Sequence, residues 1–180
     1  MSLLSKDCEK YFLYPSRIVP EKRIEFAINA FRIFSKENPG WKLVVVGSVS
    51  ETKEHQTYLQ QLRALAEGNA IEFKINVPDT ELRDLYSQCI GILYSPINED
   101  FGLIPLESFA SSKPCISVNE GGPKETIDDG TDGFLVNSPE EMADRMNRFA
   151  KQPELAEEMG KKGRKKVEAK FTWKHFLTRF

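Results

Sequence analysis

Two glutamates, Glu99 and Glu107, lie eight positions apart in the stretch NEDFGLIPLES. Gly102 and Pro105 lie between them, and proline is common in the first turn of a helix, where its missing N–H group would be unpaired anyway. We therefore expect a helix to begin near Leu103, with free backbone N–H groups and a partial positive charge that favour an anion. Gly102 has no Cβ, so a bulky anion can approach its backbone closely.

A carboxylate can accept two hydrogen bonds from vicinal hydroxyl groups, such as those of a ribose. Glu107 falls about one turn inside the expected helix, and Glu99 falls in the loop before it, where it can face a ligand. A diphosphate at the helix start, with a hydroxylated ring on each side, would use both carboxylates, so the stretch suits a nucleotide sugar. Because the chain has 19 glutamates in 180 residues, a surface loop followed by a solvated helix glutamate remains the alternative.

A second group of charges lies in SRIVPEKR, near the amino end of the chain. Arg17 offers a planar fork for phosphate oxygens, and Lys22 offers a point charge. Lys22 and Arg23 fall at an expected helix start, where cations oppose the helix macrodipole. An anionic ligand shared by these cations would explain them, and an exposed helix start with surface charges is the alternative.

Apolar runs alternate with helical periodicities along the chain. Strands are expected at residues 11–16, 42–47, 71–77, 91–96, 114–119 and 133–136. Helices are expected at 22–37, 54–67, from a cap at Asp79 to about 88, 104–112, 123–128, 138–150 with Ser138 as its cap, 153–170 and 172–179. Strands separated by such helices predict a doubly wound α/β domain with a parallel sheet and helices on both faces. Ligands of such domains bind beyond the carboxyl ends of the strands, where both charged groups fall.

The composition indicates an ordinary globular protein in a reducing setting and gives no indication of a metal site. A hydrophobic fraction of 40% and a charged fraction of 29% are ordinary for a globular protein. Cys8, Cys89 and Cys115 lie far apart without a C-x-x-C motif, which indicates a reducing, cytoplasmic setting with Cys89 and Cys115 in the core. Two histidines without a Cys/His cluster give no indication of a metal site.

The charge is unevenly distributed. Residues 151–180 hold nine Lys/Arg and four Asp/Glu, whereas the first 150 residues hold 16 basic and 23 acidic residues. The run KKGRKK at 161–166 predicts a solvated helix face, or else a contact with an anionic membrane or a lipid-linked acceptor at the inner membrane surface. Nucleic acid is not indicated, because no aromatic residues are interleaved with these charges.

Three motifs resemble those of one enzyme family. EDFGLIPLE resembles the E-x-F-G-x-x-x-x-E signature of retaining GT-B glycosyltransferases of the glycosyltransferase family 4 (group 1) type. SRIVPEKR is similar to that family's G-R…K-G element, and PCISVNEGGPKETIDDGTDGFLV to its P-V-I…GG-x-x-E-x-I…G-x-x-G-x-L-V segment. The motifs occur in the family's order, and the resemblance covers residues 11–175. It implies that 11–180 form a Rossmann-like, C-terminal donor-binding domain of about six strands, and we expect residues 1–10 to be a linker or expression remnant.

The resemblance also assigns roles to the charged residues. Arg17 and Lys22 would hold the diphosphate of the donor, and Glu99 would bind hydroxyl groups of the donor sugar. Together these three side chains would form the catalytic group. Cations at the leaving phosphate stabilise the charge that develops there in the transition state.

Further donor-binding residues follow from the same motif match: Phe101, Gly102, Leu103, Glu107 and Val77. The backbone N–H groups of Gly102 and Leu103 would contact the diphosphate. Glu107 would hold the ribose, and Val77 would pack against the base.

Five residues depart from the family pattern. Ser16 and Arg23 replace glycines that usually precede the arginine and follow the lysine, and Asp100 stands where glycine is common. Ser112 and Lys113 stand where a glycine usually precedes the proline. These changes keep the charged residues that the motifs supply, but they make the preference for sugar and base harder to predict.

The family resemblance implies a hexosyltransferase that retains anomeric configuration and needs no cofactor beyond its substrate, GDP-mannose or a UDP-hexose. Mannose is favoured because the family contains many mannosyltransferases. No D-x-D motif occurs, so a metal-held diphosphate is not expected. The family's N-terminal acceptor domain has no counterpart in these 180 residues, so we expect this chain to bind donor but transfer little alone. A non-catalytic nucleotide-binding or interaction module and a GT-B sugar-nucleotide epimerase are the alternatives.

Overall fold

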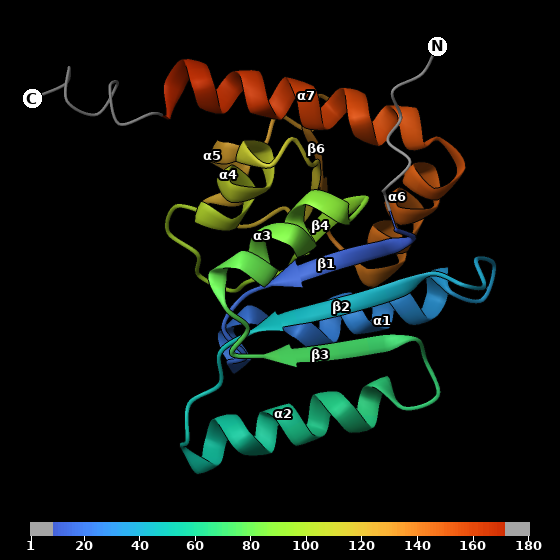
Figure 1. Ribbon diagram of the computed structural model, residues 1–180, viewed down its shortest axis with the longest axis vertical. Coiled ribbons are helices and arrows are strands. Elements are labelled where there is room, and N and C mark those ends of the chain that lie inside the picture. Colours follow the sequence, from blue (N-terminus) through green and yellow to red (C-terminus); the bar gives the residue numbers. More distant parts are fainter. Residues whose placement is uncertain (1–8, 172–180) are drawn as a thin grey trace, which may run out of the picture.

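The computed structural model of the chain describes residues 9–171, so the expected helix at 172–179 lies outside the described residues (Figure 1). Six strands form one all-parallel sheet in the order β3-β2-β1-β4-β5-β6. Their bounds are β1 Tyr11–Pro15, β2 Lys42–Gly47, β3 Ile71–Ile75, β4 Gly91–Tyr94, β5 Cys115–Val118 and β6 Gly133–Val136. The predicted doubly wound, Rossmann-like sheet is therefore confirmed.

Helices cover both faces of this sheet. In Figure 1, α1 lies behind the strands, where it packs on α2 and α6, and α3 lies in front of them. A second packed group joins α4 to α5 and α7. Their bounds are α1 Ile24–Phe34, α2 Lys53–Ala66, α3 Asp79–Gln88, α4 Leu103–Ala110, α5 Pro123–Thr126, α6 Pro139–Lys151 and α7 Pro153–Lys170.

The strand order reverses between β1 and β4. From β1 the chain builds outward to β2 and β3, then returns to pair β4 with the other side of β1. At such a switch point the loops that follow neighbouring strands turn in opposite directions and leave a crevice between them. The loops after β1 and β4 carry Arg17 and Glu99, so the topology brings the two predicted charged groups to one edge.

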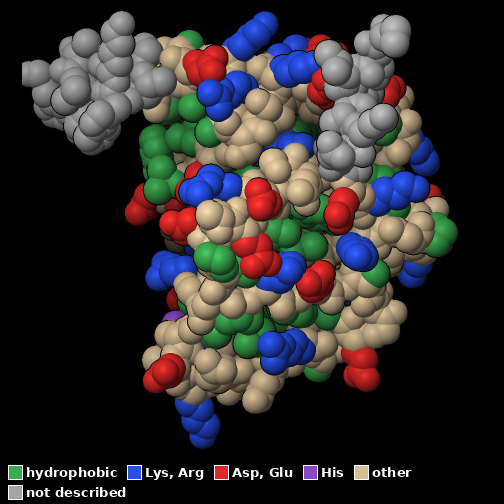
Figure 2. All heavy atoms as spheres, in the orientation of Figure 1, with side chains coloured by type: hydrophobic (Ala, Val, Ile, Leu, Met, Phe, Trp, Pro, Cys, Tyr) green, Lys and Arg blue, Asp and Glu red, His purple; other side chains and the backbone are tan. Residues whose placement is uncertain are grey.

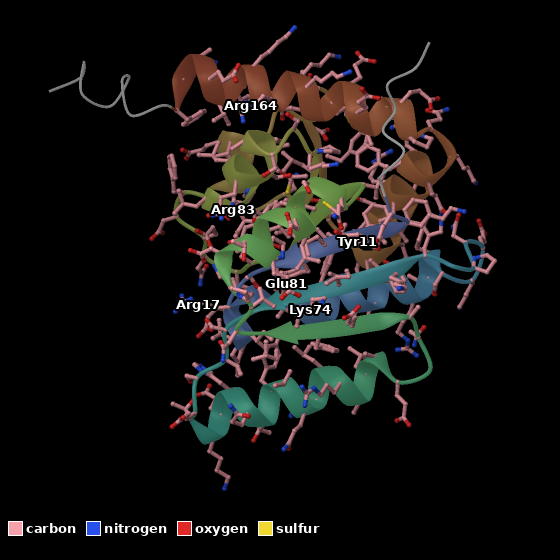
Figure 3. The ribbon with its side chains drawn as sticks, in the orientation of Figure 1. Tyr11, Arg17, Lys74, Glu81, Arg83 and Arg164 are labelled. Atoms are coloured by element: carbon pink, nitrogen blue, oxygen red, sulfur yellow. The ribbon has the colours of Figure 1, made fainter. Side chains whose placement is uncertain are left out.

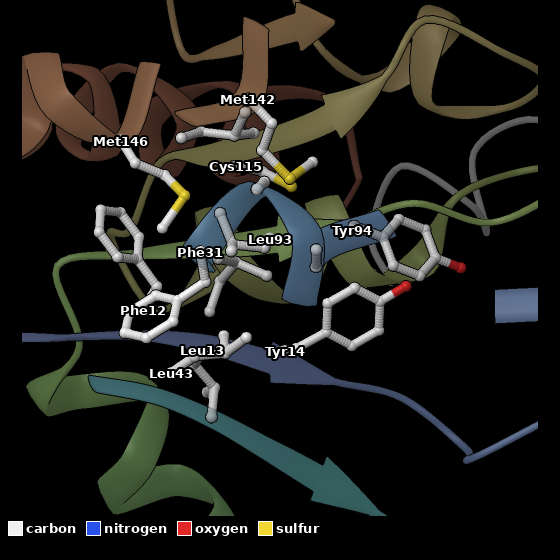
Figure 4. Close-up of a cluster of buried hydrophobic side chains, with 14 of the residues drawn as sticks. Phe12, Leu13, Tyr14, Phe31, Leu43, Leu93, Tyr94, Cys115, Met142 and Met146 are labelled. Atoms are coloured by element: carbon white, nitrogen blue, oxygen red, sulfur yellow. The ribbon is translucent and has the colours of Figure 1, made fainter. Parts of the chain in front are cut away.

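The core is continuous across the sheet. Figure 4 shows part of it, where Phe12, Leu13 and Tyr14 of β1 lie near Leu93 and Tyr94 of β4. Cys89 and Cys115 are fully buried in the core, as predicted. Strands buried on both faces explain why their sequences are nearly continuous apolar runs.

Several predicted boundaries need correction. Asp79 is not a helix cap: Pro78 holds the capping position, and Asp79 is the first residue of α3, where its charge favours the helix dipole. The strand predicted to reach residue 96 ends at Tyr94. At the next residue a side chain takes the place of a neighbouring strand as hydrogen-bond acceptor, because the Tyr14 hydroxyl accepts the Ser95 N–H at 3.1 Å. The Ser138 cap is confirmed, since its hydroxyl accepts the Glu141 N–H.

Candidate functional site

A cleft of about 480 Å³ opens at the carboxyl ends of the strands. Arg17 follows β1, and Figure 3 shows it beyond the ends of the strands. Val77 follows β3, and Glu107 lies in α4; all three line the cleft. The other lining residues are Pro15, Ser16, Val46, Gly47, Ser48, Asn76, Asp79, Leu82, Tyr86 and Ile104. The structure therefore brings together three of the predicted site residues, one cationic, one apolar and one acidic.

Glu107 is held in place by a tyrosine of α3 that also lines the cleft. The Tyr86 hydroxyl donates a hydrogen bond of 2.8 Å to Glu107 Oε2. Burial of Tyr86 raises the pKa of its hydroxyl, and the charge of Glu107 raises it further. The tyrosine therefore stays protonated and acts as a fixed donor to this carboxylate.

Lys22 and Glu99 form a compact polar cluster with Tyr94. The Lys22 ammonium lies 2.6 Å from Glu99 Oε2 and 3.1 Å from the Tyr94 hydroxyl. That hydroxyl in turn donates to Glu99 Oε2 at 2.6 Å. Partial burial alone would raise the pKa of Glu99, but the hydrogen bonds from Lys22 and Tyr94 and the charge of the lysine hold that pKa below its ordinary value.

A second buried tyrosine fixes the backbone beneath this cluster. The Tyr14 hydroxyl donates to the carbonyl of Lys22 and lies 3.0 Å from the Ser95 hydroxyl. The segment around Lys22 is also tied to the loop after β4, because the N–H of Ile97 donates to the carbonyl of Glu21 at 2.8 Å. The predicted cation at residue 22 thus lies on a backbone anchored from both β1 and β4.

The start of α4 follows the expected pattern. Gly102 is the N-cap residue with φ of 80°, a left-handed conformation that favours glycine. The first amides of the helix, which begins at Leu103, have no acceptor within the helix. The Gly102 N–H donates to Glu99 Oε1 at 3.3 Å. Phe101 is 46% exposed, and its ring contacts that of Phe171.

The glycine pair Gly121-Gly122 allows close approach of the backbone of the loop that carries Glu99. The Gly122 N–H donates to the Glu99 carbonyl at 2.6 Å. A Cβ on Gly122 would lie 2.4 Å from the carbonyl carbon of Phe101, and one on Gly121 would lie 2.5 Å from the Glu99 carbonyl oxygen. The two loops are interlocked, backbone against backbone.

Arg23 is engaged in contacts within the protein. Its guanidinium donates to the carbonyls of Ser95 and Pro96 and pairs with Glu120 at 3.0 Å. Its φ is 45°, so the helix cannot run through it, and α1 begins one residue later, at Ile24. This conformation also explains why glycine suits this position. Ser112, which likewise replaces a usual glycine, has φ of 56°.

Most of the basic run at 161–166 is paired within the chain. Lys161, Lys162 and Arg164 of α7 form ion pairs with Glu157, Glu158 and Glu168. Figure 2 shows basic and acidic side chains together over α7. Lys166 is only 11% exposed and bridges Asp128 and Asp132. The run is therefore a solvated helix face with one buried anchor, and a membrane contact stays a prediction.

Within residues 9–171, no group of three or more His, Cys, Asp or Glu side chains is placed to hold a metal ion. No helix within the same residues is long and apolar enough to cross a membrane.

Sequence reasoning missed the tyrosines. Tyr86 and Tyr94 were expected only as members of a helix face and a strand, yet their hydroxyls hold the two predicted carboxylates. The tyrosine hydroxyl is itself a signal in the sequence, because a buried tyrosine hydroxyl usually has a hydrogen-bond partner. Sequence alone does not name that partner, which lies 21 residues away for Tyr86.

Comparisons with known proteins agree with this arrangement. The family model described as glycosyl transferases group 1 matches residues 2–166. The chain is 31% identical over 185 residues to the alpha-1,3/1,6-mannosyltransferase ALG2 of Dictyostelium discoideum, covering 94% of this chain and 44% of the relative. It is 32% identical over 162 residues to a probable sucrose-phosphate synthase of Thermosipho melanesiensis, covering 88% of this chain and 37% of that protein.

A solved structure of Anabaena HepE in complex with UDP-glucose superimposes with a TM-score of 0.84 at 19% identity, covering 95% of this chain and 47% of that one. This chain thus spans less than half the length of each of these proteins. The fold, the order of the motifs and the family match agree. The chain belongs to the group 1 glycosyltransferases and forms the Rossmann-like half of a GT-B fold.

Proposed function

We propose that this chain is the donor-binding domain of a retaining, family 4 glycosyltransferase. It moves a hexose, mannose in the first place, from a nucleotide-diphosphate sugar to a glycan or lipid-linked acceptor. The observation that carries the proposal is the switch-point edge itself, where Arg17, Lys22, Glu99, Glu107 and the start of α4 lie around the end of β1 and β4.

The geometry divides the donor into three parts. The cleft between Val77 and Glu107 suits a nucleoside, with an apolar contact for the base and a carboxylate for the ribose. Arg17 and the first amides of α4 suit the diphosphate. Glu99 lies next to that position and suits the hydroxyl groups of the sugar.

Transfer breaks the bond between the anomeric carbon and the diphosphate, so negative charge grows on the leaving phosphate. Arg17, Lys22 and the start of α4 would stabilise that charge electrostatically, without a metal ion. Retention of configuration follows from the family 4 assignment. The mannose preference is supported by the ALG2 relatives. UDP-hexoses are also candidate donors, because the chain is similar to a sucrose-phosphate synthase and to HepE, whose structure contains UDP-glucose.

The acceptor site is proposed to lie on a separate N-terminal domain, in the part of the relatives that this chain does not span. The chain alone should then bind donor but show little transfer to any acceptor. A peripheral position at the inner, cytoplasmic membrane surface, through residues 161–166, is part of the same proposal. Cosedimentation with anionic vesicles that is lost in a Lys161→Ala, Lys162→Ala double variant would support it.

Calorimetric titration of the chain with GDP-mannose, UDP-glucose and UDP-N-acetylglucosamine in EDTA tests the proposal. We expect one donor to bind, and Arg17→Ala to lower its affinity about tenfold, as the loss of one charged hydrogen bond would. Arg63→Ala, which removes an exposed arginine from α2, should bind like wild type.

Other outcomes would contradict the proposal. Binding that needs a divalent cation would contradict metal independence. Absence of binding by every donor would favour an interaction module, and conversion of the donor to another sugar nucleotide without acceptor would favour an epimerase.

Tyr86→Phe should leave the fold intact and weaken binding of the nucleoside diphosphate about fivefold, because Glu107 loses the hydrogen bond that orients it, worth about 1 kcal/mol. The matched control is Tyr11→Phe, which removes another buried hydroxyl, bonded to the Leu85 carbonyl. Titration with GDP and UDP measures the effect. If the two variants bind GDP and UDP with equal affinities, the proposed role of Glu107 at the ribose is contradicted.

A further inference from the structure

Tyr94 occupies a special position between the two predicted catalytic side chains. Its hydroxyl donates to Glu99 Oε2 at 2.6 Å and accepts from Lys22 Nζ at 3.1 Å. A hydroxyl is suited to this place because it is donor and acceptor at once. The residue is 1% exposed, so its ring is held firmly by the core while its polar tip reaches the site.

The surroundings limit how far that hydroxyl can move. Tyr94 ends β4, and its ring lies 6.3 Å from that of Tyr14 in β1, centroid to centroid. Figure 4 shows the two hydroxyl groups on the same side of the cluster of buried side chains. Tyr14 in turn holds the backbone carbonyl of Lys22. Two neighbouring strands therefore fix the direction from which Tyr94 meets Glu99.

The Lys22–Glu99 pair poses a problem for donor binding. The Lys22 ammonium is bonded to Glu99, yet a bound diphosphate would draw that ammonium toward its own oxygens. Glu99 would then lose its charge partner while its carboxylate is needed, ionised and correctly oriented, for the sugar. The groups that face Glu99 are Lys22, the Tyr94 hydroxyl and the Gly102 N–H.

We propose that Tyr94 is a positioning residue that keeps Glu99 fixed and ready for the donor sugar when Lys22 turns to the diphosphate. The inference rests on the proposed donor-binding function. It adds a residue that the motif leaves out, since Tyr94 lies five positions before Glu99 and acts through it. Burial raises the pKa of the Tyr94 hydroxyl, and its hydrogen bond with Glu99 raises it further, so the proton that it donates stays in place.

The first measurement needs no ligand. The carboxyl carbon of Glu99, assigned with the help of Glu99→Gln, is followed by NMR through an acid titration. We expect its midpoint to rise in Tyr94→Phe and to stay unchanged in Tyr11→Phe. In Lys22→Met, which imitates departure of the ammonium, the midpoint should rise, and it should rise further when Tyr94→Phe is added. Equal midpoints in wild type and Tyr94→Phe would overturn the proposal.

The second measurement separates sugar from nucleotide. Tyr94→Phe should weaken the nucleotide sugar about tenfold, the effect of losing a charged hydrogen bond, and the bare nucleoside diphosphate by less than about threefold. Equal weakening of both ligands would point to a merely structural role and contradict the proposal. If wild type binds no nucleotide sugar, the proposed function fails, while the acid titration still decides whether Tyr94 controls Glu99.

Discussion

Gly122→Ala should lower donor affinity at least about 30-fold, equivalent to about 2 kcal/mol. The backbone of Gly122 has φ of −55° and ψ of −35°, which alanine adopts freely. The new Cβ would instead lie 2.4 to 2.6 Å from three backbone atoms of Phe101. Because backbone atoms cannot rotate away, the loop that carries Glu99 or the start of α5 must shift. The accompanying loss of stability should be about 1–3 kcal/mol, the usual effect of overpacking.

Gly68→Ala is the matched control for this variant. Gly68 has φ of 75° and nothing within 4 Å of an added Cβ, so alanine there costs about 1 kcal/mol of backbone strain without touching the site. Urea unfolding should show a loss of stability in both variants, and calorimetry should show a loss of donor affinity only in Gly122→Ala. Donor binding by Gly122→Ala at the wild-type level would contradict the interlocked-loop account.

Lys166→Met should destabilise the chain by about 3 kcal/mol at neutral pH, because breaking a buried ion pair leaves its partner charge unpaired. The Lys166 ammonium contacts Asp132, whose side chain is 2% exposed, and lies 2.9 Å from Asp128. It also donates to the Thr126 carbonyl at 2.8 Å, at the end of α5. Loss of the ammonium thus loosens the link between α7 and the segment from the end of α5 to Asp132.

The loss should depend on pH. Burial raises the pKa of Asp132 above its ordinary value, although the hydrogen bond and charge of Lys166 act in the opposite direction. Without Lys166 that pKa rises further in the folded state. Stability from a carboxyl whose pKa is raised on folding is present at acid pH and is lost as pH rises through the folded pKa. The deficit of Lys166→Met should therefore be smaller at pH 5 than at pH 7.5.

Urea unfolding at both pH values measures this difference. Lys161→Met is the control, because Lys161 is 65% exposed and its pair with Glu157 lies on the helix surface. Such a pair contributes about 0.5 kcal/mol or less. Equal stability of the two variants would show that Lys166 is not an anchor.

The sequence predicts the sheet well because its strands are buried on both faces. Runs such as KLVVVG and GILY are almost wholly apolar, and their lengths leave little choice of element. The edge that carries the site follows from the parallel topology, which assigns Arg17 and Glu107 to one place, whereas Val77 was assigned there by the family resemblance; all three line the cleft. Local chemistry was also sufficient for the Ser138 cap, which needs only its own backbone neighbours.

Partners that are distant in sequence could not be predicted in the same way. Lys22 and Glu99 are 77 positions apart, and each was assigned to a ligand rather than to the other. Arg23 was grouped with the cations of the site, but its left-handed backbone directs its guanidinium to the carbonyls after β4. Gly121 and Gly122 show the same limit, because glycine permits close approach without indicating what approaches.

We expect one nucleotide sugar to span the cleft and the Lys22–Glu99 cluster. Amide NMR of the chain during separate titrations with GDP-mannose, UDP-glucose and UDP-N-acetylglucosamine tests this directly. One of the three donors should shift the amides of Arg17, Val77, Leu103 and Glu107 together, with the shifts absent from α2. Shifts confined to another part of the molecule, or none with any of the three donors, would contradict it.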